Sequence, residues 1–155
     1  MTSSASAAAR FAALYAALTA AHEVGDYWAQ QDSDAVAKGR PGREGIAACA
    51  RHVAGYTAVQ ALAVCAADRA FRLGLTPHRT AAALALSAVT HYAADRGAGH
   101  WNNPGRDAPA VVRLAHATGH SQWLTRDPGA GPHMDQAWHR GWIALAAALA
   151  AGRSR

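Results

Sequence analysis

Residues 75–95 read LTPHRTAAALALSAVTHYAAD, and this stretch predicts both a helix and a pair of polar residues at its end. Thr76 is a typical N-cap residue, and Pro77 has the backbone angle that the first helical position requires. Alanine and leucine, which favour helix, fill most of the remainder. We therefore predict a helix over 77–95 whose last turns carry His91 and Asp95.

The same alanine-rich pattern continues on both sides of this stretch. A polar segment broken by glycine and proline, residues 32–45, separates two apolar segments on the N-terminal side, and Gly74 is a typical helix stop. The sequence shows no strand-like alternation and no internal repeat. Helices are therefore predicted over 4–31, 44–73, 77–95 and 133–151. The fold class that follows is all-α: an antiparallel four-helix bundle with an additional short helix inserted between helices three and four.

Residues 96–132 form the connection between the third and fourth of these helices. This connection contains two loops rich in glycine and a shorter helix over 108–124 that ends near Gly119. A chain of 155 residues is of ordinary size for one domain. We therefore interpret residues 1–155 as a single helical domain in which residues 96–132 are an insert or lid.

The composition limits the classes of function. The formal net charge of +5 and the pI of about 9.9 suit an anionic ligand such as phosphate or nucleic acid, and suit solubility alone equally well. Cys49 and Cys65 are not spaced as a metal or redox motif, so we interpret them as small buried thiols in a protein of the reducing cytoplasm. The longest apolar run, residues 53–67, falls short of the roughly 20 residues that a membrane span needs, and the sequence shows no secretory signal. A membrane location is therefore not favoured.

Pairs of histidine and aspartate recur on the predicted helices at a spacing of four residues. Besides the pair at the end of the third helix, one stands near the end of the first helix and one at the start of the last. This spacing places both side chains of a pair on one helical face. The pairs are His22 with Asp26, His91 with Asp95, and Asp135 with His139, and His52 stands in the first third of the second helix.

In an antiparallel bundle the end of one helix lies beside the start of the next, so all seven residues are expected at the same end. Imidazole and carboxylate are ligands of Zn, Mn or Fe. Seven such groups exceed the needs of one tetrahedral ion, which leaves either two ions or one ion with carboxylates as outer partners and general base. Any single pair is also explained as a plain ion pair. We predict a site for one or two divalent metal ions made of His22, Asp26, His52, His91, Asp95, Asp135 and His139.

Catalytic and substrate-binding roles follow from this prediction. Asp95 or Asp135 would bridge the ions or act as a base, and Gln30, one turn after Asp26, is the best candidate for an additional catalytic group. An anionic substrate would be held by residues of the first loop and of the insert, although a solvated loop explains the cations and core packing explains the tryptophan as well. These predicted substrate-binding residues are Lys38, Arg40, Arg43, His100, Trp101, Asn102 and Arg106.

The insert and the last helix hold further candidate residues. His116 and His120 are also four residues apart and could hold a separate metal ion, although Gly119 weakens the helix between them. The tryptophans at 123, 138 and 142 could pack a homodimer face, although core packing explains them equally well.

Five short motifs stand in a defined order along the chain. They are AHEVGDYWAQQ (21–31), a Lys/Gly loop, RHVAGY (51–56), THYAAD (90–95) and DQAWH (135–139). This order resembles that of an uncharacterised family of small helical proteins from bacteria and their phages, and the resemblance covers most of the chain except 96–132. It implies no activity, and many relatives look more membrane-like than this chain. The family positions that it implies are His22, Asp26, Gln30, His52, His91, Asp95, Asp135, Gln136 and His139.

Three functions are consistent with these patterns. The favoured function is a metal-dependent hydrolase acting on a phosphate-containing small molecule or nucleotide, because a bound metal activates water and stabilises a developing oxyanion. The order of His and Asp is loosely similar to that of His/Asp phosphohydrolases, although their adjacent His-Asp dipeptide is absent. The alternatives are an iron-dependent oxidase or oxygenase, against which the absence of Glu-x-x-His motifs counts, and a non-enzymatic nucleic-acid-binding or interaction module with structural His/Asp networks.

Overall fold

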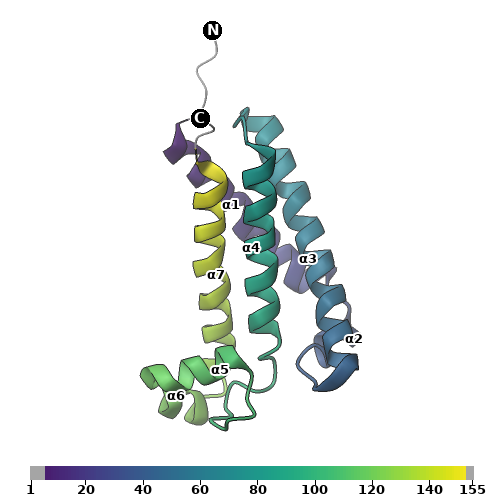
Figure 1. The fold of residues 1–155 in the computed structure, drawn as a ribbon, viewed down its shortest axis with the longest axis vertical. Helices are drawn as coiled ribbons and strands as arrows, with labels where there is room; N and C mark the ends of the chain where they lie inside the picture. Colours follow the sequence, from purple (N-terminus) through teal and green to yellow (C-terminus); the bar gives the residue numbers. More distant parts are fainter. Residues whose placement is uncertain (1–5, 153–155) are drawn as a thin grey trace. The chain divides into compact units, whose positions relative to one another are not determined.

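The computed structural model describes residues 6–152, and all regular secondary structure among them is helical (Figure 1). The prediction of an all-α protein is therefore confirmed for this part of the chain. A helix start at Ser4 lies outside the described residues. The helices are α1 (Ala7–Val24), α2 (Asp32–Ala37), α3 (Gly42–Phe71), α4 (Pro77–Asp95), α5 (Ala110–Ala115), α6 (Ser121–Arg126) and α7 (Ala130–Ala151), and π-helical turns cover Gly25–Ala29 and His116–His120.

The described residues divide into two compact units. The first unit comprises residues 6–30, 54–88 and 140–152, and the second unit comprises residues 31–53 and 89–139. Helices α3, α4 and α7 each contribute residues to both units. The interpretation as one domain, like the four-helix topology of the whole chain, stays a prediction.

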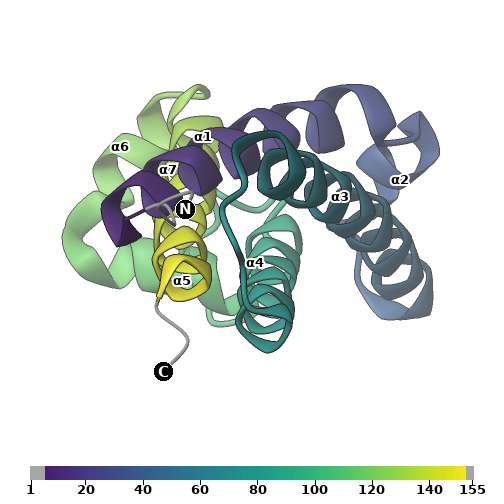
Figure 2. The same ribbon diagram turned by 90° about the horizontal axis from the view of Figure 1, so that it is seen from above.

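The first unit has an aliphatic core built from four helices. Leu14 and Leu18 of α1 pack with Val64 of α3, Ala83 of α4 and Ile143 of α7, and all five side chains are buried. Alanines fill most of the remaining core positions, and their small side chains let the helix backbones approach closely. Within this unit α4 lies between α3 and α7, and α1 crosses them (Figures 1 and 2). A short connection with Gly74 at φ +67° reverses the chain, so α4 runs antiparallel to α3.

The second unit has a separate core, formed by the insert and the first turns of α7. Trp101, Val112, Leu124 and Ala130 are buried together, and the partly buried ring of Trp138 packs against them. The indole Nε1 of Trp138 donates a hydrogen bond to the Thr90 carbonyl at 2.9 Å. This bond fixes α7 against the end of α4, where the polar residues are concentrated.

The first helix ends earlier than predicted. Helix α1 stops at Val24, a π-helical turn follows, and Gln30 is extended with ψ 134°. A β-carbon on Gly25 would lie 2.9 Å from the Tyr56 ring, so the backbone of this turn packs directly on α3. Gln30 is therefore not on the helical face of His22 and Asp26, because the π-helical turn and the extended residue change the register.

Two predicted irregular regions also differ in detail. The polar segment 32–45 contains the short helix α2, whose first turn carries Asp32 and Asp34, where the helix dipole favours acidic side chains. The shorter helix expected to end near Gly119 is α5 with the π-helical turn that follows it, and the short helix α6 begins after Gly119, which adopts φ +96°. Cys49 is buried as predicted, but Cys65 is exposed. No helix within residues 6–152 has the length and apolarity needed to span a bilayer.

Candidate metal centre

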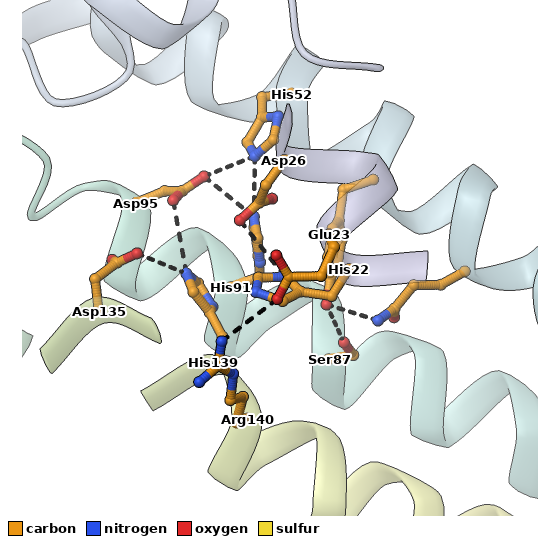
Figure 3. A network of polar contacts seen from close by, with 12 residues as sticks. His22, Glu23, Asp26, His52, Ser87, His91, Asp95, Asp135, His139 and Arg140 are labelled. Atoms are coloured by element: carbon orange, nitrogen blue, oxygen red, sulfur yellow. Dashed lines mark hydrogen bonds and ion pairs between the residues drawn. The ribbon is translucent and has the colours of Figure 1, made fainter. Parts of the chain in front are cut away.

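The second unit brings five of the predicted ligand residues together. His52 comes from α3, His91 and Asp95 from the end of α4, and Asp135 and His139 from the start of α7. The side chains point toward one another (Figure 3). Four of the five are almost fully buried, whereas the Asp135 side chain is 20% exposed. Asp135 is therefore the most exposed member of this cluster.

Three donor atoms of this cluster form a compact triangle. Nε2 of His52 lies 2.9 Å from Nε2 of His91, and Oδ2 of Asp95 lies 3.0 Å from the first nitrogen and 3.2 Å from the second. Ligands bonded at about 2.1 Å to one ion are about 3.0 Å apart at octahedral angles and about 3.4 Å apart at tetrahedral angles. A point about 2.1 Å from all three atoms lies about 1 Å outside their plane. The triangle therefore has the dimensions of one face of a metal coordination shell.

The other oxygen of Asp95 belongs to a second group of donor atoms. Oδ1 of Asp95 lies 3.9 Å from Nε2 of His139, and that nitrogen lies 3.2 Å from Oδ2 of Asp135. The ligand atoms of these three residues all lie within 4.8 Å of one another. Asp95 is thus shared between two groups, with one carboxylate oxygen directed to each (Figure 3).

Lys38 supplies a positive charge next to Asp95. Its Nζ lies 3.1 Å from Oδ1 of Asp95, and its side chain is 14% exposed. Burial raises the pKa of Asp95, but the contacts with His52 and His91 and the charge of Lys38 outweigh burial and hold this pKa well below its usual range. Asp95 is therefore a carboxylate at neutral pH.

The loop that carries Lys38 is fixed by the turn that follows Asp95. The guanidinium of Arg96 donates hydrogen bonds to the backbone carbonyls of Lys38 and Arg40, and Nε2 of His100 lies 3.0 Å from the Gly39 carbonyl oxygen. A β-carbon at Gly39 would lie 2.0 Å from a backbone oxygen of this turn, so the two segments are in direct contact. The position of the lysine is thus determined by backbone packing as well as by its ion pair.

Cys49 lies near this centre, and its thiol stays protonated at neutral pH. Burial, reinforced by the negative charge of Asp95, raises the pKa of its thiol to about 12. The sulfur is 3.8 Å from the Tyr92 carbonyl oxygen, to which the thiol donates. Cys49 belongs to no group of three ligand-type side chains found among the described residues, so the centre is a histidine and aspartate site.

The remaining predicted site residues of the N-terminal motif belong to the first unit. Nδ1 of His22 lies 3.5 Å from Oδ2 of Asp26, with both side chains buried. The Tyr56 hydroxyl in the same unit lies 2.9 Å from Ser87 Oγ and accepts a hydrogen bond from Gln60. The predicted participation of His22, Asp26 and Gln30 in the metal site stays a prediction.

The predicted substrate-binding residues all lie in the second unit, in different surroundings. Arg40 pairs with Glu44 at 2.9 Å, with both side chains exposed. Trp101 is buried in the core, which supports packing rather than a stacking role for its ring. Lys38 contacts Asp95 and His100 contacts the Lys38 loop, as described above. Arg43, Asn102 and Arg106 are exposed.

His116 and His120 do not gather a third ligand-type side chain in the described part of the chain. His116 contacts Ser121 Oγ and the Trp101 carbonyl oxygen, at 2.9 and 3.0 Å. His120 contacts the Ala115 carbonyl oxygen at 3.2 Å. Both rings therefore stabilise the turn around Gly119, and these hydrogen-bond contacts explain the two histidines without a bound ion.

The role of Arg96 was not predicted. A cation directly after the C-terminus of a helix commonly satisfies free carbonyl groups, and this signal was present in the sequence. Here the guanidinium reaches carbonyl groups of another segment, which depends on tertiary packing.

No family model, curated protein or solved structure matches the chain. The resemblance to a family of small helical proteins therefore stays a prediction. Within residues 6–152 the fold is all-helical and contains buried histidine and aspartate clusters.

Proposed function

We propose that the second unit binds a divalent transition-metal ion and uses it to hydrolyse a phosphate-containing small molecule. The observation that carries this proposal is the triangle of His52 Nε2, His91 Nε2 and Asp95 Oδ2, with sides of 2.9, 3.0 and 3.2 Å. Two imidazole nitrogens and a carboxylate oxygen that converge so closely in a buried place need positive charge between them. A metal ion or protons can supply that charge, and the ligand chemistry suits Zn, Mn or Fe.

The residues around the triangle support hydrolysis. A bound ion of this kind lowers the pKa of water and polarises a phosphoryl oxygen. Asp135, the most exposed member of the cluster, would accept a proton from a water molecule, and His139, whose Nε2 lies 3.2 Å from Asp135 Oδ2, would orient its carboxylate. Exposed arginines of the same unit and the net charge of +5 favour an anionic substrate.

Metal analysis of untagged protein tests the binding step. The protein is purified without chelator, dialysed against Zn²⁺ or Mn²⁺, and passed through a desalting column before elemental analysis. We expect at least one ion per chain, and loss of this ion in His91→Ala. The matched control is His78→Ala, which removes an exposed histidine of the same helix. Wild-type protein that retains no ion, or equal retention by both variants, would contradict the proposal.

Phosphate release from a panel of nucleotides and from p-nitrophenyl phosphate tests the reaction. Activity should depend on added Mn²⁺ or Zn²⁺, disappear with a chelator, and fall at least about 100-fold in Asp135→Asn if this carboxylate is the base. Metal binding without metal-dependent release of phosphate from any substrate would count against the hydrolase and leave the metal site in place.

An iron-dependent oxygenase is a second candidate, because two histidines and one carboxylate on one face of an ion are typical of non-haem iron enzymes. The set His52, His91 and Asp95 has this composition. Preferential retention of Fe²⁺ under anaerobic conditions, with oxygen consumption on exposure to air, would favour this candidate. Salt-dependent DNA binding that survives chelation would instead favour a binding module.

A further inference from the structure

We propose that the centre holds a single metal ion, and that the ammonium group of Lys38 occupies the place where a second ion would bind. This inference rests on the proposed metal site at His52, His91 and Asp95 and specifies its stoichiometry. The second place lies between Asp95, Asp135 and His139, and each of these residues offers a ligand atom within 4.8 Å of those of the other two.

Two donor distances in the second place are compatible with a shared metal ion. His139 Nε2 lies 3.9 Å from Asp95 Oδ1 and 3.2 Å from Asp135 Oδ2. Two donors on one ion can be no farther apart than two bond lengths, about 4.2 Å for bonds of 2.1 Å, and both distances meet this limit. A carboxylate such as Asp95, which directs one oxygen to each group, is also the usual bridge between two ions.

The charge at Asp95 Oδ1 argues against a second ion in the wild-type protein. Lys38 Nζ lies 3.1 Å from this oxygen, which is the one that a second ion would use. An ammonium group and a divalent ion on the same buried oxygen would repel each other strongly. The lysine is itself the cation that balances the carboxylate there, so it excludes the ion by position and by charge.

The backbone that carries Lys38 is held against the turn after α4. Arg96 donates to the Lys38 carbonyl, and His100 contacts the next carbonyl along the loop. Gly39 packs so closely on the turn after α4 that a β-carbon would not fit. These contacts fix the backbone of Lys38 near Asp95, so the ammonium group can leave this oxygen only by a change in its own side-chain conformation.

Metal stoichiometry in Lys38 variants tests this inference. Purified protein is titrated with Mn²⁺, and bound ions are counted by elemental analysis and by Mn²⁺ electron paramagnetic resonance. We expect one ion per chain in wild type and in Lys38→Arg, and two in Lys38→Met, with the spin-coupled signal of a carboxylate-bridged pair. Arg43→Met, which removes an exposed cation nearby in sequence, is the matched control and should bind one ion.

The outcomes separate this inference from the proposed function. No ion in the wild type overturns both. If wild type and a folded Lys38→Met both bind one ion, the role of Lys38 is overturned and the proposed metal site stands. Two ions in the wild type would have the same consequence. If Lys38→Met does not fold, His139→Ala decides, because the inference requires that this variant keep its one ion with an affinity within about threefold of wild type. Loss of the ion from His139→Ala would overturn the assignment of the two places.

Discussion

Replacement of Asp95 by asparagine should lower the stability of the folded protein and remove the increase in Tm that metal binding causes. The substitution keeps the size of the side chain and removes its charge. Asp95 is 2% exposed and contacts His52, His91 and Lys38 at 3.0 to 3.2 Å, so strong charge-assisted contacts are lost. Contacts of this kind contribute about 1.5–3 kcal/mol each. We expect the total loss in the free energy of unfolding to be about 1.5–3 kcal/mol, because water can solvate part of the Lys38 side chain in the variant. For a chain of this size that corresponds to roughly 3–12 °C in Tm.

The change in Tm on metal binding tests the role of Asp95 more specifically than the loss of stability does. A ligand at 100 times its Kd stabilises the folded state by about 2.7 kcal/mol, which is roughly 5–11 °C in Tm. Wild-type protein should show this increase between a chelator and saturating Zn²⁺ or Mn²⁺ in thermal unfolding followed by circular dichroism. Asp95→Asn should show less than about 2 °C, whereas Asp107→Asn, which alters an exposed aspartate of the insert, should respond as wild type does. An equal increase in Asp95→Asn would refute the assignment of this carboxylate as a ligand.

Further predictions follow from local geometry. Cys65 is exposed and should react with a thiol reagent at pH 8. Cys49 has a pKa of about 12, which gives a thiolate fraction of about one in 10⁴ at that pH, so it should react only after unfolding. Two thiols that react equally fast in the folded protein would contradict this prediction. Gly39→Ala should lower the free energy of unfolding by about 1–3 kcal/mol in urea denaturation, because its β-carbon meets the Ala98 carbonyl oxygen, and an unchanged midpoint would show that the loop yields. Trp138→Phe loses a 2.9 Å hydrogen bond and should cost about 1 kcal/mol in the same assay, a cost that would be absent if solvent replaced the bond.

Much of the helical structure was predictable because its signals are local. The start of α4 at Pro77 and its end at Asp95 follow from an N-cap threonine, a proline at the first position and the alanine-rich run behind them. The end of α1 was not predictable in the same way. A π-helical turn at Gly25 packs on Tyr56, and packing between distant segments leaves no periodic pattern in the sequence.

The same distinction applies to the site. The spacing of four residues predicted that His91 lies with Asp95 and Asp135 with His139, and the expected antiparallel arrangement predicted that both pairs lie near His52. The position of the Lys38 ammonium group, by contrast, depends on hydrogen bonds from the turn after α4 to the loop 38–40. A charge in a polar loop is usually solvated, so its ion pair with Asp95 could not be distinguished from sequence alone.

X-ray absorption at the zinc edge, on protein loaded with one equivalent of Zn²⁺, tests the coordination of the ion most directly. We expect nitrogen and oxygen neighbours near 2.0–2.1 Å with outer-shell scattering from two imidazole rings, one from His52 and one from His91. His91→Ala, which should not hold the ion, should show the spectrum of hydrated zinc without imidazole scattering. A wild-type spectrum with no imidazole scattering, or with a sulfur neighbour near 2.3 Å, would contradict the account.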